Sequence, residues 1–182
     1  MPAQPPLAIW DWTPDGHDLL VMSRVGPVFT AERVDVVTRK AALFLRRPHH
    51  VFQTHISHDG RWAIAQELGV GVLITHYDPK HPEQNQWRLL GLPQADLIRW
   101  SADDNTIYFL SNADSFSCVW AQRLEPVTKQ LRGSPLAVAH FHQARRSLNV
   151  QDSGEIGLAV ARNKIVLAEA ERTGNVWITK LQ

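Results

Sequence analysis

Histidine is the residue type in this sequence best suited to bind a metal ion, and it is clustered in two places. The first cluster is the segment HHVFQTHISHD, which contains His49, His50, His55 and His58. The second is HFH, where His140 and His142 would share one face of a strand and could hold a metal ion with ligands from neighbouring strands. However, the spacings match no established zinc pattern, and cysteine ligands are lacking. We therefore expect neither a metal site nor a bound cofactor.

Motifs for nucleophilic or phosphate chemistry are also missing from the sequence. It has no Gly-x-Ser-x-Gly elbow, no paired metal-ligand helix motif and no glycine-rich phosphate loop. The single cysteine, Cys118, lies in the strand-like segment FSCVWAQ, where we expect a small buried apolar side chain and no internal disulfide. These observations predict that the chain is not an enzyme.

Three stretches of the chain follow one pattern: WTPDGHDLLVMS (12–23), ISHDGRWAIAQE (56–67) and WSADDNTIYFLS (100–111). Their first residues are 44 positions apart each time (56 − 12 and 100 − 56), within the roughly 40–45 residue period of a four-stranded propeller blade. A hydroxyl residue, then Asp-Gly or Asp-Asp, precedes an apolar run. Because aspartate bonds to nearby backbone and glycine tolerates positive φ, these residues favour a tight hairpin between two strands. The repeated carboxylates are therefore expected to form turns, not acid–base pairs.

Weaker strand patterns follow each hairpin, at 28–37 and 41–47, 71–77 and 86–92, and 117–124 and 128–133. A degenerate fourth copy, LAVARNKIVLAEA (158–170), follows a longer insertion and adds one more strand at 175–181, so that the last blade lacks its outer strand. The predicted fold is all-β: a β-propeller or propeller segment of four blade-like, four-stranded antiparallel repeats. The repeats occupy about 7–47, 51–92, 95–133 and 139–182 of a single domain, 1–182.

One segment offers a helical alternative. TAERVDVVTRKAALFL (30–45) could form an amphipathic helix of about 16 residues. Elsewhere in the sequence, helix-like spacing of apolar residues is interrupted by Pro or Gly before three helical turns are complete. The four tryptophans at blade-equivalent positions are expected to pack between blades: Trp12, Trp100, Trp120 and Trp177.

The segment IRWSADDNTIYFLSNADSFSCVWAQRL (98–124) resembles a blade of the TolB-type, WD-repeat-like bacterial β-propellers. Val119-Trp120 and Val176-Trp177 match the dipeptide that opens the third strand of such blades. The resemblance implies that these are the C-terminal blades of a longer propeller, in which an N-terminal strand commonly completes the last sheet. The sequence departs from the pattern at Asp104, which replaces glycine, and in the fourth copy, which has no Asp-Gly turn.

The residues directly before the bulky inner-strand position do not repeat: they are Asp11, His55, Arg99 and Gly157. If the blades surround an axis, these positions are equivalent and lie near a central funnel. We expect Asp11, His55 and Arg99, with Trp10 and Gln53 nearby, to line a recognition surface. The alternative is that they are ordinary inner-strand residues that meet solvent, because strand ends vary in any fold.

Composition limits the partners. Lys and Arg number 19 against 18 for Asp and Glu, so no basic face suggests nucleic acid. The sequence has no apolar run of the roughly 20 residues that span a membrane. The first ten residues do not resemble a secretory signal, which suggests the cytoplasm, or an extracytoplasmic location within a longer exported protein.

The expected function is that of a non-enzymatic binding or protein–protein interaction module, as the sensory or scaffolding part of a larger bacterial protein. Its partner would be a protein, the missing blades of a longer propeller, or a second copy joined through an open sheet edge. The alternatives are a propeller accessory to a serine peptidase or lyase, and an incomplete fragment of a longer propeller.

Overall fold

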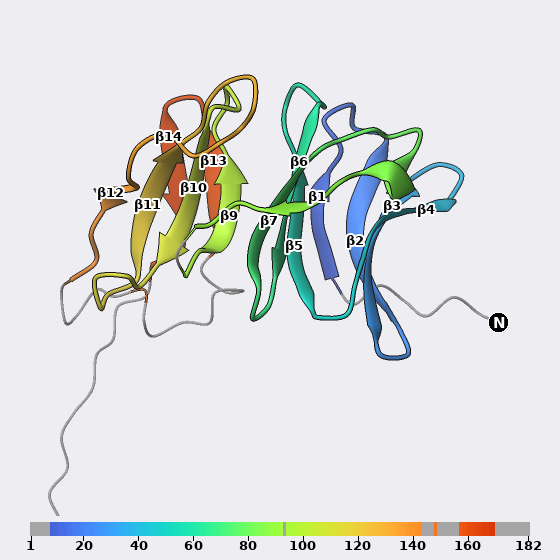
Figure 1. Ribbon diagram of the computed structural model, residues 1–182, viewed down its shortest axis with the longest axis horizontal. Helices are drawn as coiled ribbons and strands as arrows, with labels where there is room; N and C mark the ends of the chain where they lie inside the picture. The colour runs from blue at the N-terminus through green and yellow to red at the C-terminus, as the bar shows by residue number, and fades with distance from the viewer. Residues whose placement is uncertain (1–7, 93, 143–147, 149–156, 170–182) are drawn as a thin grey trace, which may run out of the picture.

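The computed structural model describes residues 8–92, 94–142, 148 and 157–169. Within these residues the strands form three four-stranded antiparallel sheets and one two-stranded sheet. Each sheet is a meander, in which every strand pairs with its neighbour in the sequence (Figure 1). The predicted all-β, blade-like architecture is therefore confirmed.

The first sheet contains β1 (Ala8–Trp12), β2 (Asp18–Val25), β3 (Val28–Asp35) and β4 (Ala41–Arg47). The second contains β5 (Val51–Ile56), β6 (Trp62–Glu67), β7 (Gly71–His76) and β8 (Arg88–Leu89), with the 3₁₀ turn η1 (Pro82–Gln84) before β8. The third contains β9 (Asp96–Trp100), β10 (Thr106–Ser111), β11 (Cys118–Arg123) and β12 (Leu136–Ala139). The fourth contains β13 (Leu158–Ala161) and β14 (Lys164–Leu167). The further strand expected at 175–181 lies outside the described residues.

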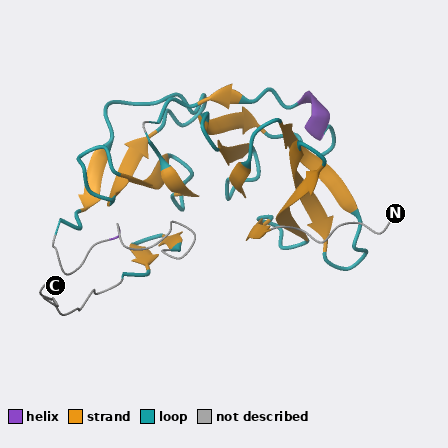
Figure 2. Cartoon of the chain, turned by 90° about the horizontal axis from the view of Figure 1, so that it is seen from below, coloured by secondary structure: helices purple, strands orange, loops and turns teal. Residues whose placement is uncertain are grey.

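The four sheets follow one another around an arc, and the described sheets do not close into a ring (Figure 2). The first strands of successive sheets come into contact, β1 with β5, β5 with β9, and β9 with β13. These four strands are therefore the innermost strands of the arc. Among the described residues, no helix is long and apolar enough to cross a membrane.

Apolar side chains fill the spaces between successive sheets. Between the second and third sheets, Ile64 and Ile74 pack with Ile98, Ile107 and Phe109, and none of these five is more than 1% exposed. Similar clusters lie between the first and second sheets and between the third and fourth. Because a sheet in a meander has two faces to cover, stacking sheet on sheet is what buries its apolar side chains.

The three predicted hairpins share one set of hydrogen bonds. In the first, the Thr13 hydroxyl donates to the Asp15 carboxylate at 2.6 Å and accepts the Asp18 N–H at 3.0 Å. The hydroxyl-to-carboxylate bond recurs from Ser57 to Asp59 and from Ser101 to Asp103. The pKa of the Asp15 carboxyl is lowered, chiefly by the Thr13 hydrogen bond. These carboxylates are turn formers, as their repetition predicts.

Asp104 adopts the same left-handed backbone as the glycines that it replaces, with φ of 57° beside 72° at Gly16 and Gly60. Its carboxylate is buried and accepts the backbone N–H groups of His58 at 2.9 Å and Asp59 at 3.0 Å, and lies 2.8 Å from His58 Nδ1. The third hairpin therefore keeps its turn geometry, and the aspartate joins it to the hairpin of the preceding sheet.

Three local expectations differ from the structure. The helical alternative is wrong, because 30–45 consists of most of β3, most of β4 and a turn between them, in which the Asp35 carboxylate accepts the N–H groups of Val37 and Thr38. The outer strand of the third sheet is β12, not 128–133, because Glu125 forms a turn by accepting the N–H of Thr128 at 2.8 Å. Trp12 is 53% exposed and does not pack between sheets, unlike Trp100 and the partly buried Trp120. Trp177 lies outside the described residues.

Candidate functional site

The four innermost strands surround a pocket of about 280 Å³. Asp11 and Trp12 of β1, His55 of β5, and Arg99 and Trp100 of β9 contribute to its lining. Ala159 and Val160 of β13 complete the lining from the fourth sheet. All four sheets therefore contribute residues to the pocket.

A chain of hydrogen bonds joins three successive sheets inside this pocket. Asp11 Oδ2 lies 2.6 Å from His55 Nδ1, and His55 Nε2 lies 2.7 Å from Arg99 Nη1. The three residues stand 44 positions apart, at the same place on three inner strands. The blade period thus brings together three residues whose types differ between blades.

Both ring nitrogens of His55 are engaged, and this fixes the state of the imidazole. Arginine can only donate, so His55 Nε2 accepts, and Nδ1 carries the proton that is donated to Asp11. Burial lowers the pKa of His55, and the Arg99 charge lowers it further, although the hydrogen bond to Asp11 opposes both. His55 is therefore neutral and its Nε2 lone pair is occupied, so it does not serve as a free general base or metal ligand.

Arg99 is held firmly by acceptors around one nitrogen. Its Nη1 lies 3.1 Å from Gln53 Oε1 and 2.8 Å from the carbonyl oxygen of Ile98, in addition to His55. Burial lowers the pKa of the Arg99 guanidinium, while the Asp11 charge raises it. Within the described residues, the hydrogen bonds of Arg99 all involve Nη1, and none involves Nη2 or Nε.

Asp11 is the accessible acceptor of the site. Its side chain is 42% exposed, whereas that of His55 is 2% exposed. Burial raises the pKa of the Asp11 carboxyl, but the hydrogen bond from His55 and further contacts outweigh burial, and the net pKa is lowered. The Asp11–His55–Arg99 network therefore holds one carboxylate, one guanidinium and a neutral imidazole, a balanced charge, and the imidazole of His58 also lines the pocket.

Trp10 does not belong to this network. Its ring packs against Phe52, with centroids 5.3 Å apart, and its buried indole N–H has no partner among the described residues. Four of the five residues singled out from the sequence therefore lie together, and Trp10 lies apart from them. The exposed indole of Trp12 is the lining residue that sequence reasoning assigned to packing.

Comparison with solved structures gives the fold. The chain superposes on TolB from Acinetobacter baumannii with a TM-score of 0.62 and 15% identity, covering 92% of this chain and 41% of that one. This chain has a β-propeller fold.

Two further solved structures match the chain. An oligogalacturonate lyase in complex with manganese matches at a TM-score of 0.51 and 12% identity, over 63% of this chain and 34% of that one. An uncharacterized protein from Listeria monocytogenes matches at a TM-score of 0.54 and 10% identity, over 79% of this chain and 45% of that one. The chain therefore spans less than half the length of each of these proteins. No protein-family model matches the sequence. No curated protein matches it either.

Proposed function

We propose that this chain is a TolB-type propeller segment that acts as a non-enzymatic binding module, and that its central pocket binds a peptide segment of a protein partner. The repeat motif and the extent of the superposition on TolB support the family assignment. The proposal for the pocket depends on a single observation, the Asp11–His55–Arg99 network at its base.

The chemistry of the network suits a peptide group. A peptide unit offers one N–H donor and one carbonyl acceptor. The exposed carboxylate of Asp11 can accept the donor, and Nη2 or Nε of Arg99 can donate to the carbonyl. The indole of Trp12, which is 53% exposed, offers an apolar surface for a neighbouring side chain of the peptide. Because the charge of the Asp11–His55–Arg99 network is balanced, a neutral polar group fits it better than a phosphate or a cation.

Catalysis is disfavoured by the same residues. The lining residues described for this pocket include no hydroxyl, thiol or amine side chain that could act as a nucleophile. The imidazole of His55 has both nitrogens occupied, and the imidazole of His58, which also lines the pocket, has its Nδ1 2.8 Å from the Asp104 carboxylate. We therefore propose a binding role in preference to a propeller accessory to a peptidase or lyase.

Site-specific photo-crosslinking in cells tests the proposal. A photoreactive amino acid at position 12 should capture a discrete protein partner, because Trp12 lies at the pocket. The matched control is position 37, where Val37 is 84% exposed and does not line this pocket. Capture at position 12 should be lost when Arg99→Gln is added, since the variant removes the charged donor. Equal capture at both positions, or capture that Arg99→Gln leaves unchanged, would refute the pocket as the binding site.

A further inference from the structure

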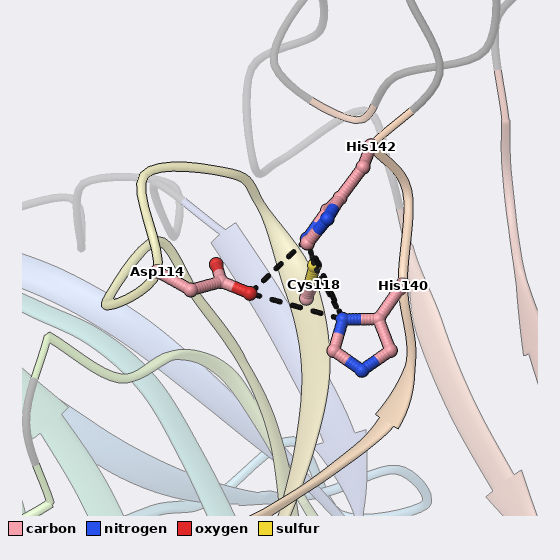
Figure 3. Close-up of side chains that lie close together, drawn as sticks. All are labelled: Asp114, Cys118, His140 and His142. Carbon is pink, nitrogen blue, oxygen red and sulfur yellow. Dashed lines mark hydrogen bonds and ion pairs between the residues drawn. The ribbon is translucent and has the colours of Figure 1, made fainter.

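Four potential metal ligands lie together at one end of the third sheet, away from the residues that line the central pocket: Asp114, Cys118, His140 and His142. We call them the Asp-Cys-His-His cluster. Asp114 lies in the turn between β10 and β11, Cys118 is the first residue of β11, and the two histidines follow β12 (Figure 3). Their donor atoms all lie within 4.8 Å of one another.

Strand pairing explains why these residues meet. β11 and β12 are antiparallel, with Val119 opposite Ala139. One step further toward this end of the sheet, Cys118 and His140 are therefore neighbours on adjacent strands. His142 stands two residues beyond His140, so that both imidazoles reach the same side. The ring of Phe116 stacks on that of His142, with centroids 4.4 Å apart and planes 28° apart, and orients it.

The donor atoms make more close contacts than their protons can satisfy as hydrogen bonds. His142 Nε2 lies 3.1 Å from Asp114 Oδ2, 3.2 Å from Cys118 Sγ and 3.4 Å from His140 Nδ1. A ring nitrogen carries at most one proton and can donate it fully to only one of these three atoms. His140 Nδ1 lies 3.8 Å from both Asp114 Oδ2 and Cys118 Sγ.

A tetrahedral metal ion accounts for all of these contacts together. Zinc binds imidazole nitrogen and carboxylate oxygen at about 2.0–2.2 Å and thiolate sulfur at about 2.3 Å, which places tetrahedral donor atoms roughly 3.3–3.6 Å apart. Five of the six separations, at 3.1–3.8 Å, surround that range, and the sixth, between Asp114 and Cys118, is within 4.8 Å.

We propose that the Asp-Cys-His-His cluster is a zinc site. Thiolate, imidazole and carboxylate are all zinc ligands, and four protein ligands make a closed site of the structural type. Cys118 is buried, whereas the side chains of His140 and His142 are 54% and 43% exposed, so the ion can enter from solvent. Binding converts the Cys118 thiol to a thiolate and releases its proton to the buffer. The bound ion would join the β10–β11 turn to the segment after β12.

The sequence analysis named His140 and His142 as residues that could hold a metal ion but expected no site, because the four ligands together follow no short motif. The cysteine and the first histidine are 22 residues apart, and the aspartate comes from a different turn. The register of β11 against β12 brings Cys118 beside His140, and the β10–β11 turn adds Asp114.

The first test is a metal titration of the chelator-treated protein. One equivalent of Co²⁺ should give the visible bands of a tetrahedral site and a near-ultraviolet thiolate-to-cobalt charge-transfer band, and Zn²⁺ should displace it. His142→Ala and His140→Ala should each weaken Zn²⁺ binding at least about tenfold. Both side chains are largely exposed, so these variants should fold. The matched control is His81→Ala, which removes another exposed histidine 3.1 Å from an aspartate and should leave Zn²⁺ affinity unchanged.

The second test uses the thiol itself. Because Cys118 is the only cysteine, alkylation of the unmodified chain reports on this site alone. Zn²⁺ should slow alkylation in the wild type and in His81→Ala but not in His142→Ala. An octahedral Co²⁺ spectrum without the charge-transfer band, or equal Zn²⁺ affinity in wild type and both histidine variants, would overturn the proposal.

Discussion

Replacing His55 with glutamine should change how the stability of this protein depends on pH. His55 is neutral in the folded state, because burial lowers its pKa, and Arg99 adds to that effect. In the unfolded chain a histidine titrates near pH 6.5. Below about that pH the unfolded state therefore binds a proton that the folded state does not, and folding stability is lost as the pH falls.

The size of the change in the free energy of unfolding follows from this difference in proton binding. One group that titrates only in the unfolded state changes the free energy of unfolding by at most about 1.4 kcal/mol per pH unit. Between pH 7.5 and 5.5, an unfolded-state pKa of about 6.5 gives a loss of up to about 1.4 kcal/mol. The lowered pKa of Asp11 acts elsewhere, since the stability that it contributes is present above its ordinary value of 3.8 and lost only as the pH falls through its folded-state value.

Urea denaturation at pH 5.5, 6.5 and 7.5 measures this effect. His55→Gln keeps a polar side chain but cannot titrate, so the wild type should lose up to about 1.4 kcal/mol more than the variant across this range. The difference between the two pH profiles is the quantity of interest, because the substitution also lowers stability at every pH. His17→Gln, at an exposed position, is the control for removing one histidine.

A wild type that loses less stability than the His55→Gln variant as the pH falls would refute the reasoning. If His55 were protonated and formed an ion pair with Asp11, its folded-state pKa would be raised, and the wild type would gain stability relative to the variant as the pH falls. Parallel profiles would also contradict a neutral, buried imidazole.

Three further substitutions test the fold by urea denaturation. Asp104→Gly relaxes the left-handed backbone but removes the carboxylate that accepts two backbone N–H groups and contacts His58 Nδ1, and should lower stability by about 1–2 kcal/mol. A gain in stability would show that the hydrogen bonds between the two hairpins contribute nothing. Gly16→Ala should cost about 1 kcal/mol from φ of 72° alone, because nothing lies within 4 Å of the added methyl group, and no loss would contradict the turn geometry. Phe109→Ala, at a side chain 1% exposed between the second and third sheets, should cost about 3–5 kcal/mol; a loss below 1 kcal/mol would contradict close packing there.

The parts of this structure that repeat were predictable from the sequence. The Ser or Thr, Asp and Gly of the hairpins act within a few residues of one another, so local chemistry alone specifies them. The period of 44 then placed Asp11, His55 and Arg99 at equivalent positions, and their meeting follows from the blades surrounding one axis. Their role in binding stays a prediction.

The parts that depend on register or on face were not predictable. Cys118 and His140 become neighbours through the pairing of β11 with β12, and the exposure of Trp12 at the pocket depends on the local path of β1, which has an irregular register between Ile9 and Asp11. A one-residue change in register moves every side chain of a strand to the other face. Periodicity in a single sequence does not determine that choice.

The meander topology has a kinetic consequence. Each sheet pairs only strands that are neighbours in the sequence, so it can form soon after its own residues leave the ribosome, without waiting for distant segments. The pocket is different, because its hydrogen bonds connect residues of three sheets. It should therefore assemble late in folding, and substitutions at His55 should accelerate unfolding while leaving the refolding rate nearly unchanged.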